Sequence, residues 1–176
     1  METTGLIAFL TEHQTAVPFI AAALAAVETI AFLSIFVPST ALLMAVGAAS
    51  STGAFSLGPI WVGATIGALI GSSFSYWLGW AFGARMLAAW PLRDHVDAVA
   101  RTKALFARWG GLAIVAGHFI GPLRPVVFLF AGLSRMRFWA FMAFNVAGAA
   151  SWAYLIPKSG AVGGDILGWL WRALGF

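Results

Sequence analysis

Three ionisable residues lie deep within apolar parts of the sequence: Glu28, His118 and Arg124. A charge at the centre of a bilayer costs a few kcal/mol, about 3 on insertion scales, so such residues are functional candidates by default. Arg124 offers a fork of N–H donors that suits a phosphate. It also lies at a break in the apolar sequence, where unpaired backbone N–H groups add positive potential. The donors of Arg124 and its position at this break therefore predict an anion-binding site.

These residues leave alternatives open. A structural ion pair with Glu28 competes with ligand binding by Arg124, and Glu28 is also a candidate to carry a proton. His118 precedes Arg124 by six residues and is either a second phosphate-binding group or a side chain packed between helices. If His118 lines the same cavity as Arg124, its protonation below about pH 6.5 adds a second cation. Phosphate binding should then tighten in mild acid.

Enzyme signatures are absent from the sequence. The histidines, His13, His95 and His118, are far apart and lack close acidic or histidine neighbours, so no metal site is expected. The sequence has no cysteine, no Gly-x-Ser-x-Gly nucleophile elbow and no phosphate-binding loop. We therefore expect a protein that is not an enzyme and needs no cofactor.

The composition of the 176-residue chain indicates that lipid surrounds it. Apolar side chains make up 61% of the residues and charged ones 9%, against about a quarter charged in a soluble domain. A chain of this size cannot hide that much apolar surface from water. The net charge of +4 fits cations that orient a membrane protein better than nucleic-acid binding. The first residues lack the basic start of a secretory signal, so we expect no cleavage.

The longest stretch without ionisable residues, 29–84, can hold two membrane passages. Turn-forming residues at 50–59 separate the two passages, and the second is predicted to begin near Pro59 and end near Gly83. Small residues recur along it at four-residue spacing: Gly63, Gly67, Gly71, Ser75, Gly79 and Gly83. This ladder predicts close packing against another helix.

Two apolar stretches, 27–49 and 112–133, contain helix breakers near their middles. The breaks are formed by Pro38, Ser39 and Thr40 in the first stretch and by Gly121, Pro122 and Pro125 in the second. Each half-helix of about ten residues covers about 15 Å, which is half the hydrocarbon thickness. This length predicts re-entrant hairpins that enter and leave on one side. A kinked spanning helix is the alternative.

The two broken stretches are similar to each other, which indicates an internal repeat. Corresponding broken segments in two halves point to a transporter site. The cations at 85–108 place that segment in the cytoplasm, with a helix at about 92–108 on the membrane surface. The first hairpin then opens outward and the second inward. We therefore predict one all-α, multi-pass membrane domain over residues 1–176, with spanning helices and two opposed re-entrant hairpins in an inverted repeat.

The C-terminal part is predicted to cross the membrane twice. Residues 138–157 are expected to cross outward, and a C-terminal helix at about 160–176 is expected to cross back.

Several motifs occur in a familiar order. An acidic residue precedes a broken hairpin, and the glycine ladder leads to Tyr76-Trp77-Leu78-Gly79. The motifs that follow are Phe106-Ala107-Arg108-Trp109-Gly110, His118-Phe119-Ile120-Gly121-Pro122-Leu123-Arg124, Phe130-Ala131-Gly132 with Met136, and Asn145-Val146-Ala147-Gly148-Ala149 with Trp152. Over about residues 15–157 the chain resembles the DedA family of bacterial membrane proteins, also called the SNARE-associated or VTT-domain superfamily.

The resemblance implies opposed re-entrant hairpins and movement of lipid across the bacterial cytoplasmic membrane. The implied substrate is a polyprenyl-phosphate carrier or a related phospholipid, with a link to the proton gradient. Glu28 and Arg124 match the family's acidic and arginine positions. Many members have a second acidic residue where this chain has Thr40, and an arginine where it has His118. These two departures bear on the proton coupling and on the identity of the head group.

The sequence thus favours a lipid-phosphate translocase whose partner is an anionic membrane lipid. The alternative is a proton- or cation-coupled transporter of a small solute, with Glu28 as the coupling group. A third hypothesis is a scaffold in which the buried charges only hold helices together. The sequence leaves the oligomeric state open, a homo-oligomer included.

Overall fold

The computed structural model describes residues 12, 15–30, 39–50, 56–83, 85, 92–94, 96–120 and 124–173. Its elements are α2 (Val17–Thr29), α3 (Ser39–Ser50), α4 (Leu57–Phe82), the 3-10 turn η1 (Leu92–Asp94), α6 (Val96–Trp109), α7 (Leu112–Gly117), α8 (Arg124–Leu133) and α9 (Phe138–Ala173). Every element in these described ranges is helical, which agrees with the predicted all-α class.

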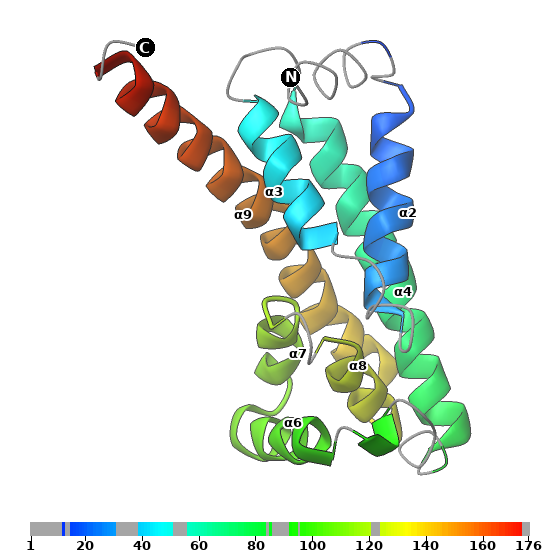
Figure 1. Cartoon of the computed structure of the whole chain (residues 1–176). Helices are drawn as coiled ribbons and strands as arrows, with labels where there is room; N and C mark the ends of the chain where they lie inside the picture. The colour runs from blue at the N-terminus through cyan, green and yellow to red at the C-terminus, as the bar shows by residue number, and fades with distance from the viewer. Residues whose placement is uncertain are drawn as a thin grey trace.

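Two long helices, α4 and α9, run through the whole height of the molecule (Figure 1). Each contains a 26-residue segment that is long and apolar enough to cross a membrane, Leu57–Phe82 and Phe138–Gly163. Large apolar side chains on both helices face outward, among them Ile70, Trp77 and Trp139. Such a surface is costly in water and suits lipid tails. The predicted break near residues 50–58 is confirmed, because α3 ends at Ser50 and Ser56 caps the start of α4.

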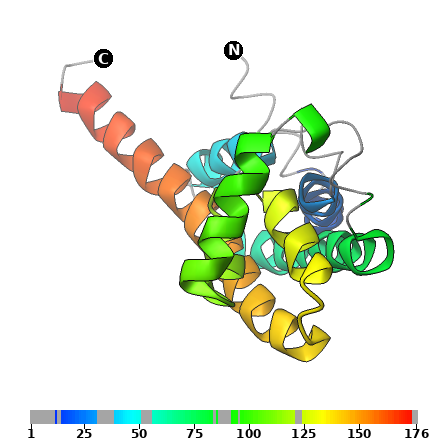
Figure 2. The same cartoon turned by 90° about the horizontal axis from the view of Figure 1, so that it is seen from below.

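Four shorter helices fill the two halves of the molecule between the long ones. In Figure 1, α2 runs from the upper end to the middle and α3 returns to the upper end, whereas α7 and α8 do the same from the lower end. Helices α2 and α8 pack against α4, while α3 and α7 pack against α9. The amphipathic helix α6 lies across the lower end against α7 and α8 (Figure 2).

The glycine ladder of α4 packs against other helices, as predicted. A Cβ atom on Gly67 would overlap the backbone of Ala22 in α2, and one on Gly79 would overlap the backbone of Leu129 in α8. Gly63 and Gly71 also face α2. The missing side chains let the helix backbones touch, which increases dispersion contacts where lipid provides no hydrophobic driving force.

The two halves use the same helix contact. The contact of α3 with α9 and the contact of α8 with α4 each involve one glycine from each helix. In both contacts, each glycine lies against the backbone of its partner helix, at the residue three positions before the partner's glycine. The contacting residues are Gly47 with Pro157, Gly160 with Met44, Gly132 with Tyr76, and Gly79 with Leu129. The two halves of the molecule thus share one kind of glycine contact between a short helix and a long one.

The C-terminal half differs from the prediction of two crossings. Residues 138–173 form the single helix α9, with Pro157 inside it. Gly160, near which the second crossing was expected to begin, lies within α9 and allows its backbone to touch Met44 of α3. A proline is tolerated within such a helix because neighbouring groups satisfy the freed backbone. At 36 residues, α9 is about 54 Å long and exceeds the hydrocarbon thickness.

The first broken stretch also differs in its limits. The helix before the break is α2, which starts at Val17 rather than near Val27 and ends at Thr29. Its apolar residues contact the ladder of α4, and this packing fixes a helix of only 13 residues. The expected break residues Pro38, Gly121 and Pro122 lie outside the described residues.

Candidate functional site

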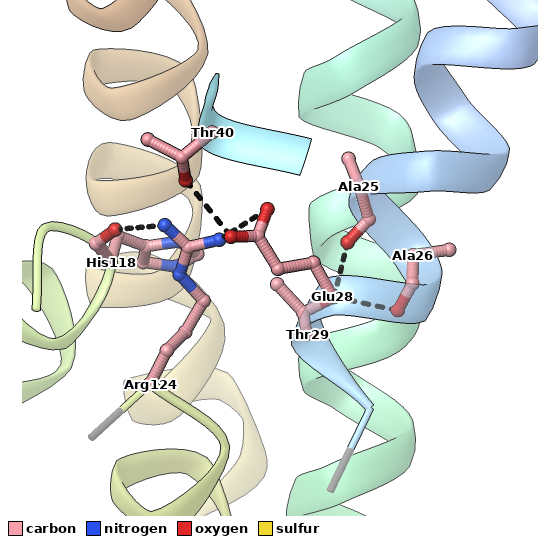
Figure 3. A network of polar contacts seen from close by, with 7 residues as sticks. All are labelled: Ala25, Ala26, Glu28, Thr29, Thr40, His118 and Arg124. Carbon is pink, nitrogen blue, oxygen red and sulfur yellow. Dashed lines mark hydrogen bonds and ion pairs between the residues drawn. The ribbon is translucent and has the colours of Figure 1, made fainter. Parts of the chain in front are cut away.

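The inner ends of the four short helices meet in the middle of the molecule. Figure 3 shows Glu28 from the last turn of α2, Thr40 from the start of α3, His118 just after α7 and Arg124 at the start of α8. Ser39 is the first residue of α3 and Pro125 the second of α8. The helix breaks therefore bring together polar residues that lie far apart in the sequence.

Arg124 is buried, with 1% of its surface exposed. Its Nη1 lies 2.9 Å from Glu28 Oε2, and its Nη2 donates a hydrogen bond to the backbone carbonyl of His118 at 2.6 Å. The guanidinium also stacks on the ring of Trp152, with 4.4 Å between Cζ and the ring centroid. The predicted alternative of an ion pair with Glu28 is thus present, and it occupies only part of the guanidinium.

Glu28 is held by one residue from each pair of short helices, Thr40 of α3 and Arg124 of α8. Thr40 donates a hydrogen bond to Glu28 Oε1 at 2.9 Å, while Oε2 faces Arg124. The next residue, Thr29, accepts a hydrogen bond from Ser75 Oγ through its backbone oxygen at 2.8 Å. This contact fixes the end of α2 on α4, where Gly71 leaves room for it. Only 7% of Glu28 is exposed.

His118 uses its ring and its backbone for different contacts. Its carbonyl binds Arg124, whereas its Nε2 lies 3.0 Å from Asn145 Oδ1. The Asn145 amide donates to Ser72 Oγ at 2.8 Å, and the Ser72 hydroxyl donates to the carbonyl of Leu69. This chain of donors requires Asn145 to accept from His118, so Nε2 carries the ring proton. The role of His118 as a second phosphate-binding group stays a prediction.

Sequence reasoning did not identify Asn145, Ser72 or Trp152 as site residues. Asn145 is a polar residue without charge in a long apolar helix, and its position is a signal that could have been used. Ser72 lies next to the glycine ladder, where a small residue is naturally interpreted as a helix-packing position. Trp152 is one of nine tryptophans, and in the sequence it stood out only as part of a family motif.

Several buried polar atoms of the site have no hydrogen-bond partner among the described residues. They include Arg124 Nε, Arg124 Nη1, His118 Nδ1 and Trp152 Nε1. Nη1 is close enough to Glu28 for an ion pair but is not aligned for a hydrogen bond. Buried donors are rarely left unpaired in native proteins, because each costs about 1–3 kcal/mol. The guanidinium therefore retains donor capacity for another acceptor.

The charges also lie at unfavourable helix ends. Glu28 is at the negative end of α2, and Arg124 is at the positive end of α8. Each helix end would favour the opposite charge, so the mutual attraction of the pair must offset two unfavourable helix dipoles. An anion near Arg124 and a proton or cation near Glu28 suit the two helix ends. The described residues contain no cluster of His, Cys, Asp or Glu that fits a metal.

Comparison with known proteins places this arrangement in a family. The VTT domain matches residues 37–162, which run from the start of α3 through the apolar part of α9. The chain belongs to the VTT-domain family, also known as the DedA family. The matched region includes Thr40, His118, Arg124 and Trp152, whereas Glu28 precedes it. The resemblance found in the sequence is confirmed.

The relatives are membrane proteins. Inner membrane protein YabI of Escherichia coli strain K12 is 30% identical over 133 residues, which cover 74% of this chain and 52% of YabI. An uncharacterised membrane protein of Mycobacterium bovis is 36% identical over 134 residues, which cover 73% of this chain and 62% of that protein. The chain thus spans little more than half the length of these curated relatives. No solved structure matches it.

Proposed function

We propose that this VTT-domain protein moves a lipid with an anionic phosphate head group, such as a polyprenyl phosphate, across the bacterial cytoplasmic membrane. The observation that carries the proposal is the buried guanidinium of Arg124, which lies where the two pairs of short helices meet and whose Nε has no hydrogen-bond partner among the described residues. A guanidinium in this setting binds phosphate oxygens through charge-assisted hydrogen bonds. In this proposal the protein forms no covalent bond with the lipid and needs no cofactor.

The short helices act as two opposed re-entrant hairpins in this proposal. Helix α2, with 13 residues, is about 20 Å long, and α8, with 10 residues, is about 15 Å long. Neither spans the hydrocarbon layer of about 30 Å. The repeated glycine contacts of α3 with α9 and of α8 with α4 support an inverted repeat. Paired hairpins that open to opposite sides suit alternating access around a fixed central site.

Charge bias supports the orientation. The exposed residues Arg93, Arg101 and Arg108 lie on or next to α6, and Arg135 and Arg137 follow α8. All of these cations lie at the end from which α7 and α8 enter (Figure 1). By the bias of basic residues towards the cytoplasm, this end faces inward. In this proposal the chain is a multi-pass protein, and α6 rests on the cytoplasmic surface.

Charge balance couples the lipid to a proton. Arg124 and Glu28 form a neutral pair at 2.9 Å. A phosphate bound to Arg124 leaves a net negative charge unless Glu28 moves away or takes up a proton, because a poorly screened interior disfavours an excess charge. Head-group binding and proton uptake by Glu28 therefore favour each other. Through this linkage a proton gradient can drive the movement of the lipid across the membrane.

A proton- or cation-coupled solute transporter is the second candidate. The buried carboxylate of Glu28, with Thr40 on one oxygen, is the observation that favours it. A solute carrier would accelerate uptake of a water-soluble substrate into liposomes and leave lipid flipping at its background rate. Lipid flipping therefore separates the two candidates.

The experiment reconstitutes the full chain into liposomes that contain a fluorescent polyprenyl phosphate. Quenching of the outer leaflet reports the rate at which inner lipid becomes accessible. Wild type and Arg108→Gln, which removes an exposed arginine of α6, should both accelerate exchange. Arg124→Gln and the neutral double variant Glu28→Gln/Arg124→Gln should fall to the rate of protein-free liposomes. Folded wild-type protein that exchanges no faster than empty liposomes would rule the proposal out.

A further inference from the structure

Trp152 of α9 lies directly against the guanidinium of Arg124. Its ring centroid is 4.4 Å from Arg124 Cζ, and none of its surface is exposed. It belongs to a packed cluster that includes Ala25 of α2 and Leu43 of α3. The indole therefore lies between the first hairpin and the arginine that opens α8. A stacked ring and guanidinium attract each other strongly where water is excluded.

The indole N–H of Trp152 is buried without an acceptor among the described residues. Trp152 Nε1 has no hydrogen-bond partner within the described ranges, and neither has Arg124 Nε. A buried tryptophan N–H usually finds an acceptor, because leaving it unpaired carries the full desolvation cost. Phenylalanine would fill much of the same space without that cost. Two donors without partners among the described residues, one on each member of the stacked contact, leave room for an acceptor from a ligand.

The chemistry of the two groups selects the kind of ligand. Indole Nε1 and guanidinium nitrogens are donors only, and neither can accept a hydrogen bond. A ligand that satisfies both must therefore carry acceptor oxygens, and the charge of Arg124 favours an anion. A cationic or donor-rich solute would leave both N–H groups unpaired. A phosphate, with several acceptor oxygens on one atom, fits both donors.

We propose that Trp152 is a second ligand-binding residue, whose indole N–H donates to an oxygen of the phosphate group held by Arg124 while its ring supports the guanidinium. The inference rests on the proposed function and names a residue that recognises the head group. The ring and the N–H have separate roles, so a variant that keeps the ring and removes the N–H isolates the contact.

The test measures binding of farnesyl phosphate to the full chain in detergent micelles. Trp152→Phe keeps an aromatic ring over Arg124 and should bind farnesyl phosphate at least about tenfold more weakly. Its thermal stability should be equal to that of wild type or higher, because an unpaired buried donor is removed. Trp61→Phe is the matched control, since Trp61 Nε1 donates to the backbone oxygen of Ala150 at 2.9 Å. This control should lose stability and keep wild-type affinity.

Two further ligands show which part of the probe matters. Farnesol, which lacks the phosphate, should bind wild type and Trp152→Phe equally. Inorganic phosphate that displaces the probe with the same dependence on Trp152 would support the contact and extend it to free phosphate. Unchanged affinity of Trp152→Phe for farnesyl phosphate, or an equal loss for farnesol, would overturn the inference.

Failure of the inference and failure of the proposed function give different results. If Arg124→Gln loses farnesyl phosphate and Trp152→Phe keeps it, only the role of Trp152 is wrong. If folded wild-type protein does not bind farnesyl phosphate, the proposed function fails and the inference fails with it.

Discussion

Glu28 Oε2 and Arg124 Nη1 lie 2.9 Å apart, although Glu28 is in the last turn of α2 and Arg124 begins α8. The pair thus joins the inner tips of two helix pairs that approach from opposite ends of the molecule (Figure 3). Any motion that separates the two pairs must break this contact, and an anion that binds the remaining donors of Arg124 adds negative charge beside Glu28. The ion pair is therefore both a structural contact and the point at which a ligand can act.

The first prediction concerns the stability of this pair. Glu28→Gln or Arg124→Gln leaves one buried charge uncompensated and should lower the free energy of unfolding by about 3–5 kcal/mol. The double variant should lose less than the sum of the two, because it leaves no unpaired charge. Thermal and denaturant unfolding in detergent measure this coupling. Strictly additive losses would show that the two side chains do not interact.

The second prediction concerns pH. If a bound phosphate requires a proton on Glu28, binding takes up a proton, and the affinity of wild type rises as the pH falls, by at most about tenfold per pH unit. Glu28→Gln needs no proton and should retain only the pH dependence of the phosphate itself. Titrations with farnesyl phosphate between about pH 8 and pH 6 compare the two proteins. Identical profiles would remove Glu28 from the coupling.

The third prediction concerns the helix contacts. Gly132→Ala places a methyl group against the backbone of Tyr76 in α4 and should destabilise the protein by about 1–3 kcal/mol, because two backbones must separate. Gly163→Ala is the control, since a Cβ there meets nothing within 4 Å. This control should be neutral or stabilising by up to about 1 kcal/mol, as expected for alanine in a helix. Equal effects of the two changes would contradict the close packing of α8 on α4.

The sequence predicted the parts of the fold that depend on local signals. The turn residues predicted α4 from near Pro59 to near Gly83, close to its observed limits at Leu57 and Phe82, and the glycine ladder predicted its packing. Glu28, Thr40 and Arg124 stood out because a charge or a helix break in apolar sequence is unusual. The structure brings all three within one set of contacts.

Other parts depend on tertiary contacts and could not be predicted locally. One crossing was expected from the sequence to end at residue 157 and another to begin at about 160, yet both positions lie within α9, where Gly160 packs against Met44 of α3. The start of α2 at Val17 depends on contact with α4, which no local pattern shows. Trp152 is distinguished only by what it touches, since tryptophans are common in this chain.

The fourth prediction concerns the hydrogen bonds that hold His118. Asn145→Ala removes the acceptor of the His118 Nε2–H and the donor to Ser72 Oγ. The loss of these two hydrogen bonds should lower the free energy of unfolding by about 1–3 kcal/mol. His118→Leu in the same background removes the stranded donor and should recover part of the loss. Because the backbone of His118 holds Arg124, farnesyl phosphate affinity should also fall in Asn145→Ala. A drop in stability with unchanged affinity would separate this network from the site.

The most direct measurement is a structure of the full chain with a polyprenyl phosphate bound in a lipid nanodisc. The account predicts a phosphate within hydrogen-bond distance of Arg124 and Trp152, with the carboxylate of Glu28 moved away from Nη1 or sharing a proton with the ligand. A phosphate bound only at the surface cations Arg135 and Arg137, with the 2.9 Å contact between Glu28 and Arg124 intact, would contradict it.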